Sequence, residues 1–200
     1  MVVPVRFDSQ RLREDLVNLA PWQRVAFAVG CVEVLIPAYL KFSELEQVGD
    51  PVLVRTSVDA VWSGLQGGDM SGAASELPTP DSIKELLPAE EDWNEWAPQA
   101  EDAIASLVYL LELMRDDNVD LAVYAAERAY SAADEFEARE QDLEVLGRDA
   151  GEALLQASSI QAELQRQVDA LDALQDPAAD SSIISGLRAA AMQVPVGGPT

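Results

Sequence analysis

Residues 21–42 read PWQRVAFAVGCVEVLIPAYLKF, and this stretch decides the fold. Between Val25 and Ile36 it carries a single charged side chain, Glu33. A surface helix has one apolar stripe and one polar face, so a helix that is apolar all round belongs in the middle of a helical domain. A carboxylate buried there costs roughly several kcal/mol unless it meets a donor or a positive partner. Glu33 is therefore predicted to be either a structural anchor or part of a site.

The rest of the chain reads as helices separated by proline and glycine. A first helix is expected from Asp8 or Ser9 to about Leu19, and a second from Pro21 to about Gln47, bent or broken at Pro37. Asp50 and Pro51 open the next helix. Further helices are predicted over about 82–87, from Pro98, from Asn118, over about 152–174, and over about 181–192.

Strand-like alternation of apolar and polar residues occurs only in short terminal stretches such as 2–7. We therefore predict an all-α, single-domain bundle of about seven helices around a central buried helix, spanning residues 1–192. Residues 66–80 have three glycines, two prolines and no periodicity, which predicts a mobile loop. Residues 193–200 are expected to form a disordered tail.

The net charge of −23 is concentrated in the middle of the chain, where residues 76–150 hold 21 acidic and 5 basic residues. Such a field repels nucleic acid and anionic lipid and attracts basic proteins. The alternative is an acidic source proteome, because only two lysines stand against eleven arginines. The candidate surface for a basic protein partner is the acidic, tryptophan-containing segment formed by Glu90, Glu91, Asp92, Trp93, Glu95 and Trp96. Its two indoles are interpreted either as packing anchors or as an exposed docking patch.

Most catalytic chemistry is missing from the sequence. The chain has no histidine, so an imidazole base and the commonest zinc ligands are absent. No phosphate-binding or dinucleotide-binding glycine motif occurs, and Cys31 lies in the most apolar run, as a small buried hydrophobe does. We predict no catalytic residues, metal or cofactor.

One set of polar residues stands out against the apolar pattern. Arg55 and Asp59 are four residues apart on one helix, and Gln167 lies in the middle of an apolar stripe. The set that could converge between helices is Glu33, Arg55, Asp59, Glu163 and Gln167. It is either a buried ion pair and amide that fix the helix register, or a small-ligand or carboxylate-based catalytic site. We expect Glu33 to be buried and to meet Arg55 or a polar group of residues 161–167.

Several motifs occur along the chain in a distinctive order. They are Leu16, Leu19, Trp22, Gln23, Phe27, Glu33, Pro37, Tyr39, Phe42, Gly49, Asp50, Arg55 and Trp62, then Trp96-Ala97-Pro98 with Asp102-Ala103, and the run QAELQRQ at 161–167. Together these motifs resemble those of the YjaG family of bacterial proteins, a domain of unknown function. The resemblance covers about residues 12–187 and implies an all-helical fold without an established activity.

Three functions remain open from the sequence. The first is a non-enzymatic protein-binding module, for example an inhibitor or an immunity-type antagonist of a basic partner. The second is a ligand-binding domain or enzyme that uses Glu33 and Arg55, and the third is a helical assembly subunit that forms a homodimer.

The run from Val25 to Leu40 is too short to span a bilayer and contains Glu33 and Pro37, which predicts a cytoplasmic protein without membrane contact.

Overall fold

A computed structural model describes residues 4–87, 94–141 and 150–194. Among these residues there are eleven α-helices, one 3-10 helix and no strand, so the all-α prediction is confirmed. The helices outnumber the roughly seven predicted, and three of the additional ones arise because two expected long helices are interrupted and one expected loop is partly helical. Their bounds are α1 (Ser9–Val17), α2 (Pro21–Glu33), α3 (Ile36–Glu46), α4 (Pro51–Gly67), α5 (Met70–Glu76), α6 (Pro80–Lys84), α7 (Ala97–Asp116), α8 (Val119–Glu140), α9 (Ala150–Leu155), α10 (Ser158–Gln175), η4 (Ser181–Ile183) and α11 (Ile184–Gln193).

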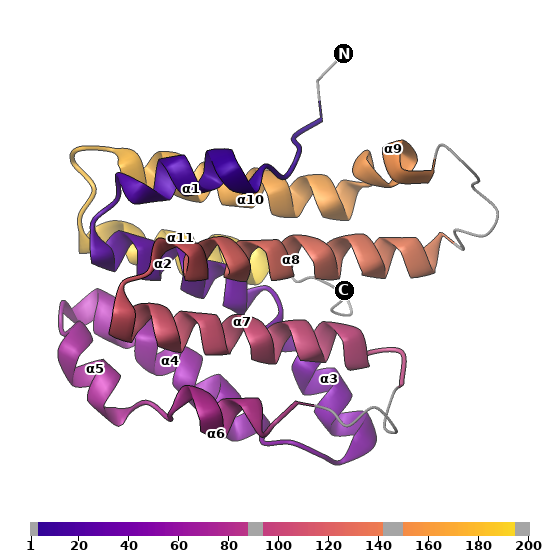
Figure 1. Cartoon of the computed structure of the whole chain (residues 1–200), viewed down its shortest axis with the longest axis horizontal. Helices are drawn as coiled ribbons and strands as arrows, with labels where there is room; N and C mark the ends of the chain where they lie inside the picture. Colours follow the sequence, from indigo (N-terminus) through magenta and orange to yellow (C-terminus); the bar gives the residue numbers. More distant parts are fainter. Residues whose placement is uncertain (1–3, 88–93, 142–149, 195–200) are drawn as a thin grey trace.

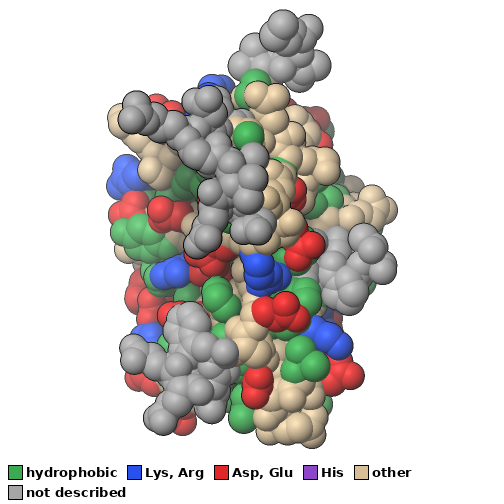
Figure 2. Space-filling model, turned by 90° about the vertical axis from the view of Figure 1, so that its right-hand side faces the viewer, with side chains coloured by type: hydrophobic (Ala, Val, Ile, Leu, Met, Phe, Trp, Pro, Cys, Tyr) green, Lys and Arg blue, Asp and Glu red, His purple; other side chains and the backbone are tan. Residues whose placement is uncertain are grey.

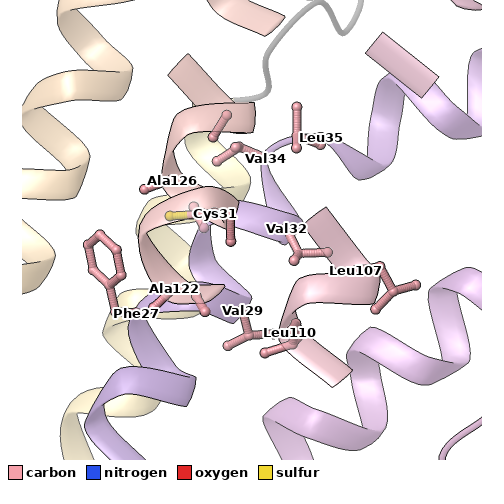
Figure 3. Packing of buried hydrophobic residues seen from close by; sticks show 14 of the residues in the cluster. Phe27, Val29, Cys31, Val32, Val34, Leu35, Leu107, Leu110, Ala122 and Ala126 are labelled. Carbon is pink, nitrogen blue, oxygen red and sulfur yellow. The ribbon is translucent and has the colours of Figure 1, made fainter. Parts of the chain in front are cut away.

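The helices are stacked in layers around α2. Figure 1 shows α1, α9 and α10 along one side, α2, α8 and α11 beneath them, and α7 followed by α3 to α6 on the other side. Helix α2 packs against α4, α7, α8, α10 and α11. Every residue from Val25 to Ile36 is buried, which confirms the predicted central helix. In Figure 3 its side chains lie among Leu107 and Leu110 of α7 and Ala122 and Ala126 of α8.

The predicted bend near Pro37 is present. Helix α2 ends at Glu33 and α3 begins at Ile36, with Pro37 in the first turn of α3 and an angle of 41° between the two helices. No single helix in the described part of the chain is long and apolar enough to cross a membrane; α2 and α3 meet that criterion only as a bent pair. In this fold α2 is instead enclosed by other helices.

Helix ends follow the capping chemistry of the sequence. The carboxylates of Asp8, Asp50 and Asp180 and the amide oxygen of Asn118 each accept a backbone N–H at the start of a helix. Gly49 adopts a positive φ of 78°, and a side chain there would collide with the Tyr39 hydroxyl, which accepts the N–H of Asp50.

The mobile loop predicted over 66–80 is partly helical, because residues 70–76 form α5. Local capping explains the difference, because the Asp69 carboxylate accepts the backbone N–H of Gly72 at 2.8 Å. Thr79 caps the next helix in the same way, because its hydroxyl oxygen accepts the backbone N–H of Ser82 at the start of α6. Helix α4 extends to Gly67 and ends where Gly68 takes a positive φ of 70°.

The long helix predicted over 152–174 is interrupted. Helix α9 ends at Leu155, Ala157 is extended, and α10 begins at Ser158. The side-chain amide of Gln161 donates to the carbonyl oxygen of Leu155 at 2.7 Å, which satisfies a group that the break leaves without its helical partner. The predicted tail beyond Val194 lies outside the described residues.

Candidate functional site: polar clusters on two faces of the central helix

The first cluster surrounds Glu33 at the end of α2. Arg55 of α4 donates two hydrogen bonds to this carboxylate, from Nη1 to Oε1 at 2.6 Å and from Nη2 to Oε2 at 3.0 Å. The indole Nε1 of Trp62, two turns further along α4, donates to Oε2 at 2.7 Å. Glu33 is 4% exposed, as predicted. The three hydrogen bonds from Arg55 and Trp62 supply the donors that a buried carboxylate needs.

A second arginine and a second carboxylate complete this Glu33 cluster. Asp59 accepts from Arg55 Nη2 at 2.8 Å and also pairs with Arg188 of α11. The Nε of Arg188 lies 4.0 Å from Glu33 Oε2. Burial alone would lower the pKa of Arg55, but the hydrogen bonds and charges of Glu33 and Asp59 outweigh it, so that pKa is raised. The Glu33 cluster therefore ties α2, α4 and α11 together.

The second cluster lies on another face of α2 and is built around Glu163 of α10. Arg166 donates to both carboxylate oxygens of Glu163, from Nε at 2.6 Å and from Nη2 at 2.7 Å, and its Nη2 also donates to Cys31 Sγ at 3.4 Å. Gln167 donates from Nε2 to Glu163 Oε1 at 2.7 Å and to the carbonyl oxygen of Ala126 in α8 at 3.2 Å. The Glu163 cluster joins α2, α8 and α10.

The Glu163 cluster is almost sealed from solvent. Glu163 is 0% exposed and Arg166 is 7% exposed. Burial opposes the charge on Arg166, but Glu163 outweighs that effect and raises its pKa. Burial raises the pKa of Cys31 to about 11, although Arg166 works against it, so the thiol stays protonated at neutral pH. Cys31 is thus a buried small side chain, as predicted.

The sequence predicted a single polar set, whereas the structure contains two separate clusters. Glu33, Arg55 and Asp59 meet in one, and Glu163 and Gln167 meet in the other. The prediction that all five converge is wrong because the two clusters use different faces of α2. Three participants, Trp62, Arg166 and Arg188, were missed. The spacing of Glu163 and Arg166, three residues apart on a helix, was the available signal for one of them.

Between α7 and α8 the structure reveals a further polar group that the sequence did not indicate. Asp102 is 4% exposed and accepts from Arg128 Nη1 at 2.9 Å. Burial raises the pKa of Asp102 to about 7; Arg128 opposes this rise, and Glu135 and Glu101 add to it. Burial likewise raises the pKa of Glu135. Asp102 and Glu135 share the field of Arg128, and Glu101 adds negative charge near both.

Two tyrosines extend this group along the seam of α7 and α8. The rings of Tyr109 and Tyr124 have centroids 5.5 Å apart, and Tyr124 is 45% exposed. We call the side chains along this seam the α7–α8 surface, which comprises Glu101, Tyr109, Tyr124, Arg128 and Glu135.

The predicted acidic and tryptophan-containing segment is only partly described. Glu90, Glu91, Asp92 and Trp93 lie outside the described residues, and Glu95 is exposed. The half-buried ring of Trp96 lies 6.3 Å from the ring of Phe136, and the guanidinium of Arg139 lies 5.5 Å from the Trp96 ring. This geometry agrees with the packing-anchor interpretation of Trp96. In Figure 2, which looks onto the end of the molecule where α7 begins and α8 ends, acidic side chains alternate with basic and hydrophobic ones.

The chemistry available to the two α2 clusters is limited. Each carboxylate at the centre of a cluster is bound by arginine, and neither cluster contains an exposed nucleophile beside a base. Within the described ranges, no group of three or more histidine, cysteine, aspartate or glutamate side chains is arranged to hold a metal ion. The geometry is that of ion pairs and an amide that join helices.

Fold and sites together define an acidic, all-helical protein with two ion-pair clusters on its central helix. The chain belongs to a family described as proteins of unknown function, DUF416, whose model matches residues 11–197. It is similar to the crystal structure of a DUF416 family protein from Shewanella baltica OS155 at 1.91 Å resolution, with a TM-score of 0.75 and 18% identity. The match covers 90% of this chain and 93% of that one, and it shows the shared fold. No curated protein matches the chain.

Proposed function

We propose that this chain is a non-enzymatic protein-binding module that engages a basic protein through the α7–α8 surface, in the manner of an inhibitor or immunity-type antagonist. We also infer that it is a YjaG-like bacterial protein that works in the cytoplasm. The observation that supports binding is the excess of carboxylates around Arg128. Asp102 accepts its hydrogen bond, while Glu101 and Glu135 add negative charge to the same place.

A basic partner would relieve this excess charge. A lysine or arginine brought to Glu101 or Glu135 would gain a charge pair with an exposed carboxylate. Tyr124 supplies an exposed aromatic side chain beside this charge, and tyrosine is among the residues enriched in binding hot spots. Glu95, at the start of α7, continues the acidic edge that the sequence indicated.

The clusters at α2 offer less to a binding partner or a substrate. Glu33 accepts hydrogen bonds from Arg55 and Trp62, and Glu163 accepts hydrogen bonds from Arg166 and Gln167. Their hydrogen bonds are made within the protein. These contacts favour the register-fixing interpretation of the polar set over the carboxylate-based site.

The test compares two triple variants with the same change in charge. One replaces Glu95, Glu101 and Glu135 with glutamine. The matched control replaces three exposed carboxylates elsewhere, through Glu14→Gln in α1, Glu44→Gln in α3 and Asp169→Asn in α10. Each protein is used to capture partners from its bacterial host, and association with the captured basic protein is then timed at rising salt concentration.

We expect the first variant to lose the partner and the control to retain it. Association of the parent should slow steeply with salt, because charges at the surface are screened beyond roughly 10 Å at 0.1 M. Equal loss in both variants would mean that only the overall charge matters. An unchanged partner set in the first variant would remove the α7–α8 surface as the binding site.

A further inference from the structure

A cavity of about 510 Å³ lies between the N-terminal segment with α1 on one side and α10 on the other. Its volume is in the range of small-molecule sites, roughly 300–1,000 Å³. Much of its lining is apolar and includes Phe7, Leu12, Leu164, Val168 and Leu171. It uses none of the residues of the α7–α8 surface, so a ligand in this cavity would bind independently of the proposed function.

One buried polar side chain, Gln167, also lines this cavity. It is 4% exposed, and its amide nitrogen uses both hydrogens, one toward Glu163 and one toward the carbonyl oxygen of Ala126. Both partners are acceptors, so the identity of the nitrogen is fixed by its surroundings. The amide oxygen is then the polar atom that Gln167 has left to offer.

No donor in the described part of the chain reaches the Gln167 oxygen. Among the described side-chain atoms, the one that is both sealed from solvent and without a partner is Arg55 Nε. Gln167 lines the cavity, so its oxygen is the acceptor that this buried side chain can present to a ligand there.

The charges at the mouth differ between the two ends of the cavity. Helix α1 runs parallel to α10, because Val5 pairs with Gln161 near the start of α10 and Gln23 donates to Leu174 near its end. Arg6 and Arg11 consequently lie toward the Gln161 end, and Asp15 and Asp172 lie toward the Leu174 end. Asp15 comes from α1 and Asp172 from α10, so two carboxylates line this end of the cavity from both of its walls.

We propose that this cavity binds a small primary amine that carries an aliphatic group. The ammonium group would donate one hydrogen bond to the Gln167 oxygen and lie in the field of Asp15 and Asp172, while the aliphatic group would pack on Val168 and its apolar neighbours. A carboxylate has no hydrogen to donate to Gln167. An alcohol can donate but gains nothing from the two carboxylates.

Three probes with the same aliphatic chain test this assignment: hexylamine, hexanol and hexanoate, titrated into the full chain by calorimetry at pH 7. Hexylamine should bind saturably and about tenfold more tightly than hexanol, which is the ratio that about 1.4 kcal/mol of added charge-assisted interaction gives. Hexanoate should bind more weakly than hexylamine, because it has no hydrogen to donate to Gln167 and meets Arg6 and Arg11 only at the opposite end of the cavity. Hexanoate binding as tightly as hexylamine, or no saturable binding by any probe, would overturn the proposal.

Two variants separate the cavity from general attraction of a cation to an acidic protein. Asp172→Asn should weaken hexylamine binding about threefold or more, whereas Asp169→Asn, an equal change on the exposed side of α10 and outside the cavity, should leave it unchanged. Val168→Phe fills the cavity without altering a polar contact and should abolish binding. If a folded Val168→Phe variant binds hexylamine as the parent does, or if the two aspartate variants behave alike, the site is wrong.

Discussion

The Glu33 cluster and the Glu163 cluster hold different faces of the same helix with the same chemistry, but they differ in their access to water. In the Glu33 cluster the side chains of Arg55 and Arg188 are each 27% exposed and that of Asp59 is 43% exposed. In the Glu163 cluster the arginine side chain is 5% exposed and the carboxylate 0%. The cost of stranding a charge grows as water is excluded, so equal truncations on the two faces should have unequal effects.

The largest effect is expected for Arg166→Ala. Removal of this guanidinium leaves the Glu163 carboxylate buried, with the amide of Gln167 as its one remaining donor among the described residues. The free energy of unfolding should fall by about 3–5 kcal/mol, as for other broken buried pairs. Chemical denaturation followed by circular dichroism measures the loss. Replacing both partners, as Glu163→Leu with Arg166→Met, should recover most of it, and a double variant as unstable as the single one would contradict this account.

Arg55→Ala should cost less, about 2–3 kcal/mol, at the low end of the range expected for a buried pair. The carboxylate of Glu33 keeps the indole donor of Trp62, and Arg188 lies close enough to move toward it. A further test makes Arg55→Ala in an Arg188→Ala background. The cost of Arg55→Ala in unfolding free energy should be larger there than in the parent, because no second arginine can move toward Glu33. A denaturation curve for Arg55→Ala that overlays the parent would show that the pair is not stabilising.

Much of the Glu33 cluster was predictable, because a lone carboxylate in an apolar helix must find a partner and Arg55 and Asp59 have helical spacing. The Glu163 cluster was harder to predict. Arg166 lies outside the apolar stripe of this helix, and only the way α10 packs on α2 turns it inward toward Cys31. The fold class followed from periodicity, whereas the break between α9 and α10 had no such signal; there Gln161 bonds both to Leu155, just before the break, and to Val5 at the other end of the chain.

Stability should also depend on pH through Asp102. Burial raises its pKa from an ordinary value of 3.8 to about 7, so between these two pH values the folded state holds a proton that the unfolded chain has released. The resulting stabilisation is fully present below about pH 4, falls as the pH rises from there to about 7, and does not change further above pH 7. Relative to Asp102→Asn, the parent should lose up to about 1.4 kcal/mol of unfolding free energy for each pH unit between about pH 4 and pH 7. A difference between the two proteins that stays flat from pH 5 to pH 8 would contradict the raised pKa.

The smallest effect concerns Gly30 in α2. A Cβ at this position would lie 3.1 Å from Nη1 of Arg166, which is held by Glu163 and cannot readily withdraw. Gly30→Ala should therefore lack the gain of about 1 kcal/mol that alanine brings to a helix interior. Gly186→Ala in α11, where nothing lies within 4 Å, is the matched control and should show that gain in thermal denaturation. Equal gains in stability in the two variants would mean that the Arg166 side chain moves away from the added Cβ at no cost.

The most direct test of the difference between the two faces is the salt dependence of the two arginine truncations. The unfolding free energies of the parent, Arg166→Ala and Arg55→Ala are measured at 0.05 M and 1 M sodium chloride, where the screening length falls from above 10 Å to roughly 3 Å. The cost of Arg166→Ala should be the larger and should stay nearly constant, while the cost of Arg55→Ala should shrink at high salt. Equal costs, or a salt dependence confined to Arg166→Ala, would contradict the assignment of a sealed cluster to one face of α2 and a solvent-accessible cluster to the other.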